Sequence, residues 1–190
     1  MKKLVLLAAA VLGFSAAPAL AQTATGTFSG NGHTYQWYNT ATTFDGALAA
    51  GTGGGYLVTV TSAAEEAFLR TLTGGNTVFA SGSDRETEGV WKWLQGPEAG
   101  QIFFGPGAAA GSYTNWNSGE PNNVGNEDAL HIFFGAGWND IPENSNYGYV
   151  LEFDAVPSVP EPATWGMMLL GFLGLGTAIR RRRAGGLSLA

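Results

Sequence analysis

The sequence predicts an α+β fold with two short helices and antiparallel sheets, and three observations lead to this prediction. Glycine accounts for 29 of the 190 residues, about twice its usual share of roughly 7%, which favours turns over a helical bundle. Short runs of β-branched and aromatic residues recur between turn residues, as is typical of strands. The segment after Ser62 combines a helix cap with an apolar helical face.

The first expected elements follow one another closely. Residues 33–38 are an aromatic strand, and the alanine-rich segment 44–50 is a weak helix that ends in the glycines of 51–55. Residues 56–61 are a strand because four of these six residues are β-branched.

A better-defined helix follows this strand. Ser62 caps it, and Glu65, three residues later, completes a capping box. Phe68, Leu69 and Leu72 share one face, which we expect to be buried. Further strands are expected at 77–80, 90–93, 130–134, 137–138 and 149–153.

A long polar segment lies between these strands. Residues 95–128 are mostly Gly, Ala, Pro, Asn, Ser and acidic residues, interrupted only by the apolar run 102–104, Tyr113 and Trp116. A stretch of this length without periodicity is usually either functional or disordered. The question is therefore what would order it.

The two ends of the chain carry targeting signals. Lys2 and Lys3 precede an apolar run at 4–14 and the sequence Ala19-Leu20-Ala21, a pattern typical of a secretory signal peptide over residues 1–21. A buried N-terminal helix is the alternative. At the other end, the apolar segment 164–179 reaches roughly 25 Å as a helix, the short limit for a transmembrane span.

The C-terminal segment has a characteristic order of features. Pro160-Glu161-Pro162 lies in the linker 155–163, the apolar span 164–179 follows, and an arginine-rich tail occupies 180–190. This order resembles the PEP-CTERM sorting signal. The resemblance implies processing by a membrane exosortase, with the inner membrane as an intermediate and delivery to the cell surface or outside the cell. A permanent single-span anchor, with its arginines in the cytoplasm, remains the alternative.

Residues 22–154 remain as one domain, and its charge is strongly negative. Between residues 22 and 156 there are 14 acidic residues and only Arg70, Arg85 and Lys92 as basic ones, a formal net charge of −11. Such a domain repels nucleic acid and anionic membranes and attracts cations. The absence of cysteine excludes a disulfide scaffold and, with only His33 and His131 present, argues against zinc.

The acidic and amide residues indicate a hard cation. Calcium takes about six to eight oxygen ligands from carboxylates, amides and backbone carbonyls. The segments 120–123, 126–128 and 138–140 are rich in these groups, and Asp84 and Glu88 bracket a turn further upstream. Each segment alone is more simply a turn. Together they would place several carboxylates close enough to repel one another unless a metal ion is bound.

These motifs, in this order, resemble the C-type lectin domain over residues 32–153. The resemblance rests on Glu120-Pro121-Asn122, Asn126-Glu127-Asp128 and Trp138-Asn139-Asp140, with the strands 56–61, 90–93 and 149–153 around them. It implies a C-type lectin-like fold with a long loop ordered by calcium, and a cis Pro121.

The resemblance also implies two calcium sites. The first would bind both calcium and carbohydrate; its residues are Glu120, Asn122, Glu127, Asn139 and Asp140. The second would order the loop; its residues are Asp84, Glu88, Asn123, Glu127 and Asp128. At the first site, vicinal sugar hydroxyls would donate hydrogen bonds to the carboxylates and accept them from the amides. Glu-Pro-Asn implies a mannose, glucose or N-acetylglucosamine preference.

The chain departs from the family in its cysteines. The family normally has two disulfides, whereas Ala50 and Leu151 occupy one pair of positions here and Ala129 and Glu143 the other. The loss of the second pair removes a restraint of about 2–4 kcal/mol near Trp138. We therefore expect calcium to contribute more to the order of the loop.

Two of the remaining residue types are expected to be structural. Trp37, Trp91, Trp93 and Trp116 are assigned to the core, with Trp138 as a core anchor; His33 and His131 lie in strand patterns and are not assigned to catalysis.

Three functions compete. The sequence favours a calcium-dependent carbohydrate-binding protein, not an enzyme, that binds exopolysaccharide or another glycan. A structural or protein-adhesion module of the extracellular matrix that uses calcium only to order the loop is the alternative. A glycosidase comes third, since the resemblance already assigns the paired carboxylates to metal binding.

Overall fold

The computed structural model describes residues 22–155, apart from 52 and 134, together with Met167. The chain divides after Ala155 into two units, and the helices and strands described below lie in the first. The predicted signal peptide, the transmembrane segment and the arginine-rich tail lie outside the described residues, apart from Met167. The two helices of the described part, of seven and ten residues, are too short to cross a bilayer.

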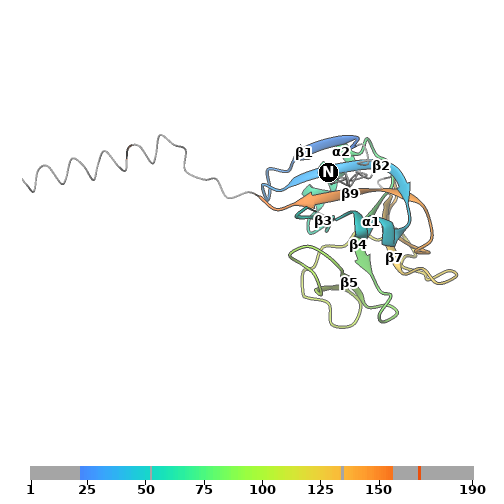
Figure 1. Ribbon diagram of the computed structural model, residues 1–190. Helices are drawn as coiled ribbons and strands as arrows, with labels where there is room; N and C mark the ends of the chain where they lie inside the picture. Colours follow the sequence, from blue (N-terminus) through green and yellow to red (C-terminus); the bar gives the residue numbers. More distant parts are fainter. Residues whose placement is uncertain (1–21, 52, 134, 156–166, 168–190) are drawn as a thin grey trace, which may run out of the picture. The chain divides into compact units, whose positions relative to one another are not determined.

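Two helices and nine strands make up the described domain (Figure 1). The helices are α1 (Phe44–Ala50) and α2 (Ala63–Leu72). The strands are β1 (Ala24–Thr27), β2 (Thr34–Thr42), β3 (Gly55–Leu57), β4 (Val78–Ser83), β5 (Trp91–Trp93), β6 (Ile102–Phe104), β7 (Ala129–Phe133), β8 (Gly137–Ile141) and β9 (Tyr147–Phe153). The α+β class predicted from the sequence is therefore confirmed.

The strands form one mixed sheet instead of purely antiparallel ones. Its main path is β1-β2-β9-β4-β5-β6, with β3 paired to β9, β7 to β4 and β8 to β7. The prediction of antiparallel sheets is wrong at one place, because β4 runs parallel to β9 through the pairs Val78↔Gly148 and Phe79↔Tyr149. Parallel pairing needs a long connection, and the whole β5–β8 region lies between these two strands. Strand β9 thus joins β2 to β3 and β4 within the sheet.

Helix α2 begins as the sequence predicts but differs in one contact. The Ser62 hydroxyl accepts a hydrogen bond from the Glu65 backbone N–H at 3.2 Å. The Glu65 carboxylate does not return to Ser62; it accepts from the Thr61 N–H at 2.8 Å and from the Tyr35 hydroxyl at 2.5 Å. Glu65 therefore ties the start of the helix to β2, and the capping box is only half formed.

The expected strand at 56–61 is shorter than predicted. In this part of the chain, the regular ladder with β9 covers Gly55–Leu57 and ends there. Beyond it, the Val58 N–H donates to the Val150 carbonyl while the Val58 carbonyl accepts from the Ser81 N–H. The segment after β3 thus bonds partly to β9 and partly to β4. It has no single partner strand along its length, and therefore forms no regular strand of its own. The sequence predicts no strand at β1, because Ala and Gly, which are depleted in strands, make up half of its four residues.

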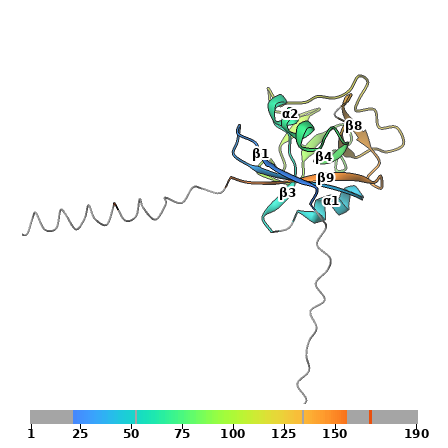
Figure 2. The same cartoon turned by 90° about the horizontal axis from the view of Figure 1, so that it is seen from above.

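The core consists of two clusters on opposite sides of β2 and β9. Helix α2 lies on one side of these strands and α1 on the other (Figure 2). Leu69 of α2 packs in the larger cluster with Trp91, Trp93 and Trp138, and Phe44 of α1 packs in the smaller one. Trp37, Trp91 and Trp93 are buried and Trp116 packs against them, which confirms their assignment to the core.

Candidate functional site

Asp140 of β8 is the centre of the candidate site. Its carboxylate is completely buried and accepts the backbone N–H groups of Asn122 at 2.9 Å and Asn123 at 2.7 Å. The Glu120–Pro121 peptide bond just before them is cis, as expected. Asn123 and Asn126 have positive φ angles of 50° and 70°, a conformation that asparagine tolerates better than most residues. The loop 120–128 is therefore folded back against the end of β8.

Two further carboxylates lie beside Asp140, and these three acids are called the Asp140 cluster below. Burial raises the pKa of Glu120, and contact with Asp140 and the charge of Glu127 raise it further. Burial and then the charge of Asp140 also raise the pKa of Glu127. Glu127 Oε2 and Asn122 Oδ1 converge on the same donor, the Val124 N–H, each at 3.0 Å. Glu120, Asn122, Glu127 and Asp140 are therefore gathered in one place.

Of the residues predicted for the first calcium site, Asn139 has the weakest connection to the Asp140 cluster. Its side-chain amide donates to the carbonyl of its neighbour Asp140, and Asn139 also lines a cavity together with His131 and Tyr147. Within the described part of the chain, no hydrogen bond joins its side chain to Glu120 or Glu127.

A second group of acids, the Asp84 cluster, lies at the end of β4. Asp84 is 2% exposed, and its Oδ2 accepts the Gly89 N–H at 2.8 Å. Burial, followed by the charges of Glu88 and Asp128, raises the pKa of Asp84 to about 6. Asn123 links the two clusters, because its Nδ2 donates to Glu88 at 2.5 Å and its Oδ1 accepts the Glu127 N–H at 2.8 Å. The second predicted set therefore also lies together.

The carboxylate and amide oxygens of the two clusters are the kinds of ligand that calcium binds. Each cluster holds one buried carboxylate oxygen without a hydrogen-bond partner among the described residues, Glu120 Oε2 and Asp84 Oδ1. An unpaired buried acceptor of this kind is costly unless a cation satisfies it. Burial is the largest cause of the raised pKa values of Asp84, Glu120 and Glu127, and the neighbouring acids raise them further. In the described residues, however, no three Asp, Glu, His or Cys side chains already stand in a metal-binding arrangement.

A buried glutamate outside the predicted calcium sites holds the segment before Glu120 in place. Glu66 of α2 is 4% exposed and accepts three hydrogen bonds. The donors are the Tyr113 hydroxyl at 2.8 Å, Asn115 Nδ2 at 2.7 Å and Trp138 Nε1 at 3.1 Å. The sequence does carry a signal for it, since Glu66 lies three residues before the buried Leu69 and shares its side of the helix. Glu66 thus fixes the loop before Glu120 and the strand that carries Asp140.

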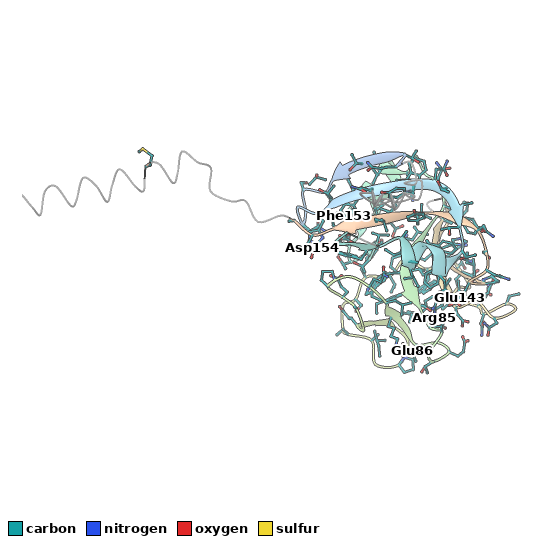
Figure 3. The ribbon with its side chains drawn as sticks, in the orientation of Figure 1. Arg85, Glu86, Glu143, Phe153 and Asp154 are labelled. Carbon is teal, nitrogen blue, oxygen red and sulfur yellow. The ribbon has the colours of Figure 1, made fainter. Side chains whose placement is uncertain are left out.

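An ion-pair group lies where the resemblance places the second missing disulfide. Arg85 and Glu143 lie side by side (Figure 3), with Arg85 Nη2 2.6 Å from Glu143 Oε1. Arg85 Nη2 is also 2.9 Å from Asp45 Oδ1. The guanidinium group also lies 5.1 Å from the centre of the Phe44 ring. Ala129, the other position of that pair, is buried in the smaller core cluster. Arg85 therefore links α1, the Asp84 turn and the segment after β8, although its partial exposure limits the expected stabilisation to about 1 kcal/mol.

His131 of β7 gives the first prediction. Burial lowers its pKa to about 4, against an ordinary value of 6.5, so between these pH values the unfolded chain binds more protons than the folded one. The free energy of unfolding should therefore rise with pH in this window. In urea titrations at pH 4.5 and 7, we expect the variant His131→Gln to show a smaller pH dependence than the parent protein, and an equal dependence would contradict the burial of a neutral ring.

The comparisons with known proteins agree with this architecture. The family model described as "Lectin C-type domain" matches residues 40–153, and "PEP-CTERM protein-sorting motif" matches residues 158–183. The chain is 35% identical over 133 residues to halomucin of Haloquadratum walsbyi, which covers 65% of this chain but only 1% of halomucin.

Solved structures share the fold. The carbohydrate-recognition domain of a human scavenger receptor C-type lectin has a TM-score of 0.57 at 21% identity, covering 70% of this chain and 98% of that domain. A type II antifreeze protein from herring has a TM-score of 0.56 at 18% identity, covering 70% of this chain and 97% of the antifreeze protein. At these identities the likeness shows the fold alone.

Proposed function

The chain belongs to the C-type lectin domain family and carries a PEP-CTERM sorting motif, and from this premise we propose that it is an exported protein that binds carbohydrate through calcium. The observation that carries the proposal is that Glu127 and Asp140 lie beside Glu120, whose buried Oε2 has no hydrogen-bond partner among the described residues. These residues have the composition that both a hard cation and sugar hydroxyls require.

The proposed binding chemistry assigns distinct tasks to the residues. When bound, calcium supplies coordination for two vicinal hydroxyl oxygens of a sugar. Glu120 and Glu127 accept hydrogen bonds from the sugar hydroxyls, and the side-chain amides of Asn122 and Asn139 donate hydrogen bonds to them. Asp140 orients the loop through the N–H groups of Asn122 and Asn123. The Asp84 cluster, with Glu88, Asn123, Glu127 and Asp128, would hold a second calcium that orders the loop.

The proposed location follows from the sorting motif. The protein would pass through the inner membrane, be processed by an exosortase-type enzyme and reach the cell surface or the extracellular space. There it would bind exopolysaccharide or another glycan of mannose, glucose or N-acetylglucosamine type. The proposal assigns no catalytic step to any residue.

A glycan array with calcium and with a chelator tests this function. We expect binding to glycans with terminal mannose, glucose or N-acetylglucosamine, lost on chelation. The double variant Glu120→Gln, Asn122→Asp exchanges the acceptor and donor positions and should change the preferred sugar by tenfold or more, with the surface variant Asn39→Ala as control. Failure to bind any glycan at saturating calcium would contradict the lectin function.

The fold shared with the herring antifreeze protein supports one alternative. In it, the domain is a structural or protein-adhesion module of the extracellular matrix, and calcium only orders the loop. A protein whose melting temperature rises with calcium but which binds no glycan would favour this function.

A further inference from the structure

The turn between β1 and β2 holds the single Asn-Gly pair of the 190-residue sequence, Asn31–Gly32. Both residues are exposed, and Gly32 has a φ angle of 77°, a left-handed value that favours glycine at this position. Asparagine followed by glycine is a reactive pair, because no side chain on the glycine keeps its backbone nitrogen away from the asparagine side chain. The turn therefore has the chemistry for spontaneous deamidation.

Deamidation of this pair needs water as its only co-reactant. The backbone nitrogen of Gly32 bonds to Cγ of Asn31, the Cγ–Nδ2 bond breaks, and the amide nitrogen leaves as ammonia with the proton of the Gly32 N–H. Water then opens the resulting cyclic imide at either of its carbonyl carbons. One product is aspartate at this position, and the other is isoaspartate, in which the main chain runs through the side-chain carbon.

In the folded domain, hydrogen bonds hold the reacting groups of this turn. The Gly32 N–H donates to the Phe28 carbonyl at 2.8 Å. Asn31 Oδ1 accepts the His33 N–H at 2.9 Å, and Asn31 Nδ2 donates to the Tyr35 hydroxyl at 2.8 Å. Ring closure consumes the Gly32 N–H and expels Nδ2, so it must break the first and the last of these bonds. The folded turn therefore opposes the reaction, and local opening permits it.

The Tyr35 hydroxyl connects this turn to two buried acids. It is 2.5 Å from Glu65 Oε1 of α2 and 3.0 Å from Glu152 Oε1 of β9, and these three residues are at most 2% exposed. His33 Nδ1 lies 2.7 Å from the same Glu152 oxygen. A hydroxyl donates one proton and accepts through its lone pairs, so the acids share the Tyr35 proton and the Asn31 amide donates to the Tyr35 oxygen. Asn31 thus fastens the turn to the place where β2, α2 and β9 meet.

Deamidation would convert this attractive contact into a repulsive one. A carboxylate at position 31 has no proton to donate to the Tyr35 oxygen, whose single proton Glu65 and Glu152 already share. It would also be the third acid at one hydroxyl group, and like charges repel. Isoaspartate would in addition lengthen the main chain inside the turn that the Phe28 N–H closes on the His33 carbonyl at 3.0 Å.

We propose that Asn31 is a site of spontaneous deamidation, that the native fold suppresses the reaction through the Tyr35 contact, and that conversion irreversibly loosens the β1–β2 turn from α2 and β9. The conversion runs in one direction because the ammonia is lost. The proposal involves neither the calcium sites nor a bound sugar, so it stands or falls independently of the proposed function.

Peptide mass spectrometry measures the reaction at each asparagine. The full-length chain in a mild detergent is kept at pH 8 and 37 °C, folded or in concentrated guanidinium chloride, and conversion of Asn31 is followed with time. We expect conversion in the denaturant to be at least about tenfold faster than in the folded protein, which corresponds to an opening free energy of about 1.4 kcal/mol or more. Asn144 is the internal control, because it is exposed and its side chain makes no hydrogen bond among the described residues; its rate should change much less.

Variants separate the protection from the effect of the product. Tyr35→Phe removes the hydroxyl and keeps the ring; it should speed conversion of Asn31 in the folded protein about fivefold, as expected for one lost hydrogen bond, and leave the rate in denaturant unchanged. Asn31→Asp installs one product directly and should lower the melting temperature by roughly 5 °C. The matched control Asn39→Asp makes the same charge change at an exposed position of β2, and should lower it by about 1 °C or less.

Three results would overturn the proposal. Equal conversion of Asn31 in the folded and the denatured chain would exclude protection by the fold. An unchanged rate in folded Tyr35→Phe would exclude the role of the hydroxyl. Equal melting temperatures of Asn31→Asp and Asn39→Asp would exclude the loosening. If circular dichroism shows that Tyr35→Phe does not fold, the comparison of folded and denatured parent and the two aspartate variants still decide.

Discussion

Replacing Asp140 with asparagine is expected to leave the calcium-free protein as stable as the parent or more so, and to weaken calcium binding at least tenfold. Without a metal, Asp140 lies beside Glu120 and Glu127, and the pKa values of both are raised partly by its charge. Removal of one charge relieves this repulsion. The asparagine carbonyl still accepts the N–H groups of Asn122 and Asn123. With calcium, the same change removes a charged ligand.

Melting curves with and without calcium measure both halves of this prediction. Extracellular calcium modules have dissociation constants of about 10⁻⁴–10⁻³ M, so 10 mM calcium should stabilise the parent by about 1.4–2.7 kcal/mol. This corresponds to a rise of roughly 4–10 °C in melting temperature for a domain of this size. In the Asp140→Asn variant the rise should fall to a few degrees at most.

Asp154→Asn is the matched control, because this exposed aspartate follows the end of β9 and accepts a hydrogen bond from the Tyr56 hydroxyl. It should keep the full calcium response. A parent protein that gains no stability from calcium would contradict both calcium sites. A parent response retained in Asp140→Asn would show that calcium binds elsewhere.

The second large effect is expected at Glu66. The variant Glu66→Ala leaves three donors without their acceptor, and one of them, Trp138 Nε1, lies in a completely buried side chain. Hydrogen bonds to a charged acceptor contribute about 1.5–3 kcal/mol each and do not add fully. We therefore expect the free energy of unfolding to fall by about 3 kcal/mol, a large share of the roughly 5–15 kcal/mol of a typical domain. Urea denaturation measures this loss.

Two further variants make this prediction specific. Glu66→Gln keeps one acceptor oxygen and should lose less stability than Glu66→Ala. Glu86→Ala removes an exposed carboxylate that pairs with Lys92 at the surface, and should cost less than about 1 kcal/mol. Because Glu66 holds the loop before Glu120, its alanine variant should also bind calcium more weakly. Equal stability losses for Glu66→Ala and Glu86→Ala would contradict the supporting role of Glu66.

Local patterns predicted much of the fold. The helix at Phe44–Ala50 and the Ser62 cap were predicted from the sequence, and both are confirmed. Strands β4, β5, β7, β8 and β9 agree with the predicted segments to within a few residues. Strand β1 was missed because pairing with β2, and not its own composition, makes it a strand. The parallel contact of β4 with β9 was also missed, since no local pattern records the direction of a distant partner.

For the candidate site, the sequence indicated the residue types but not all of their partners. Carboxylates and amides in turn segments indicated a hard cation, and the resemblance assigned them to two groups that the structure also brings together, with Asn139 attached least. The Glu66 support was not foreseen, because an acid in the first turn of a helix is ordinarily explained by the helix dipole. Likewise, no pattern indicated that Arg85 would meet Glu143.

The sequence by itself therefore determined the acidic character of the domain, its caps and turns and the chemistry of its loop. The acidic character follows from composition alone, whereas the caps and turns depend on residues within about four positions of one another, where backbone geometry fixes the contacts. Only the tertiary structure decided that Glu66 meets Tyr113, Asn115 and Trp138, which lie 47 to 72 positions away. It also decided that His131 and Asn139 line one cavity together. The physical reason is that such contacts arise when strands from distant parts of the chain pair and exclude water, a step that depends on the whole sheet.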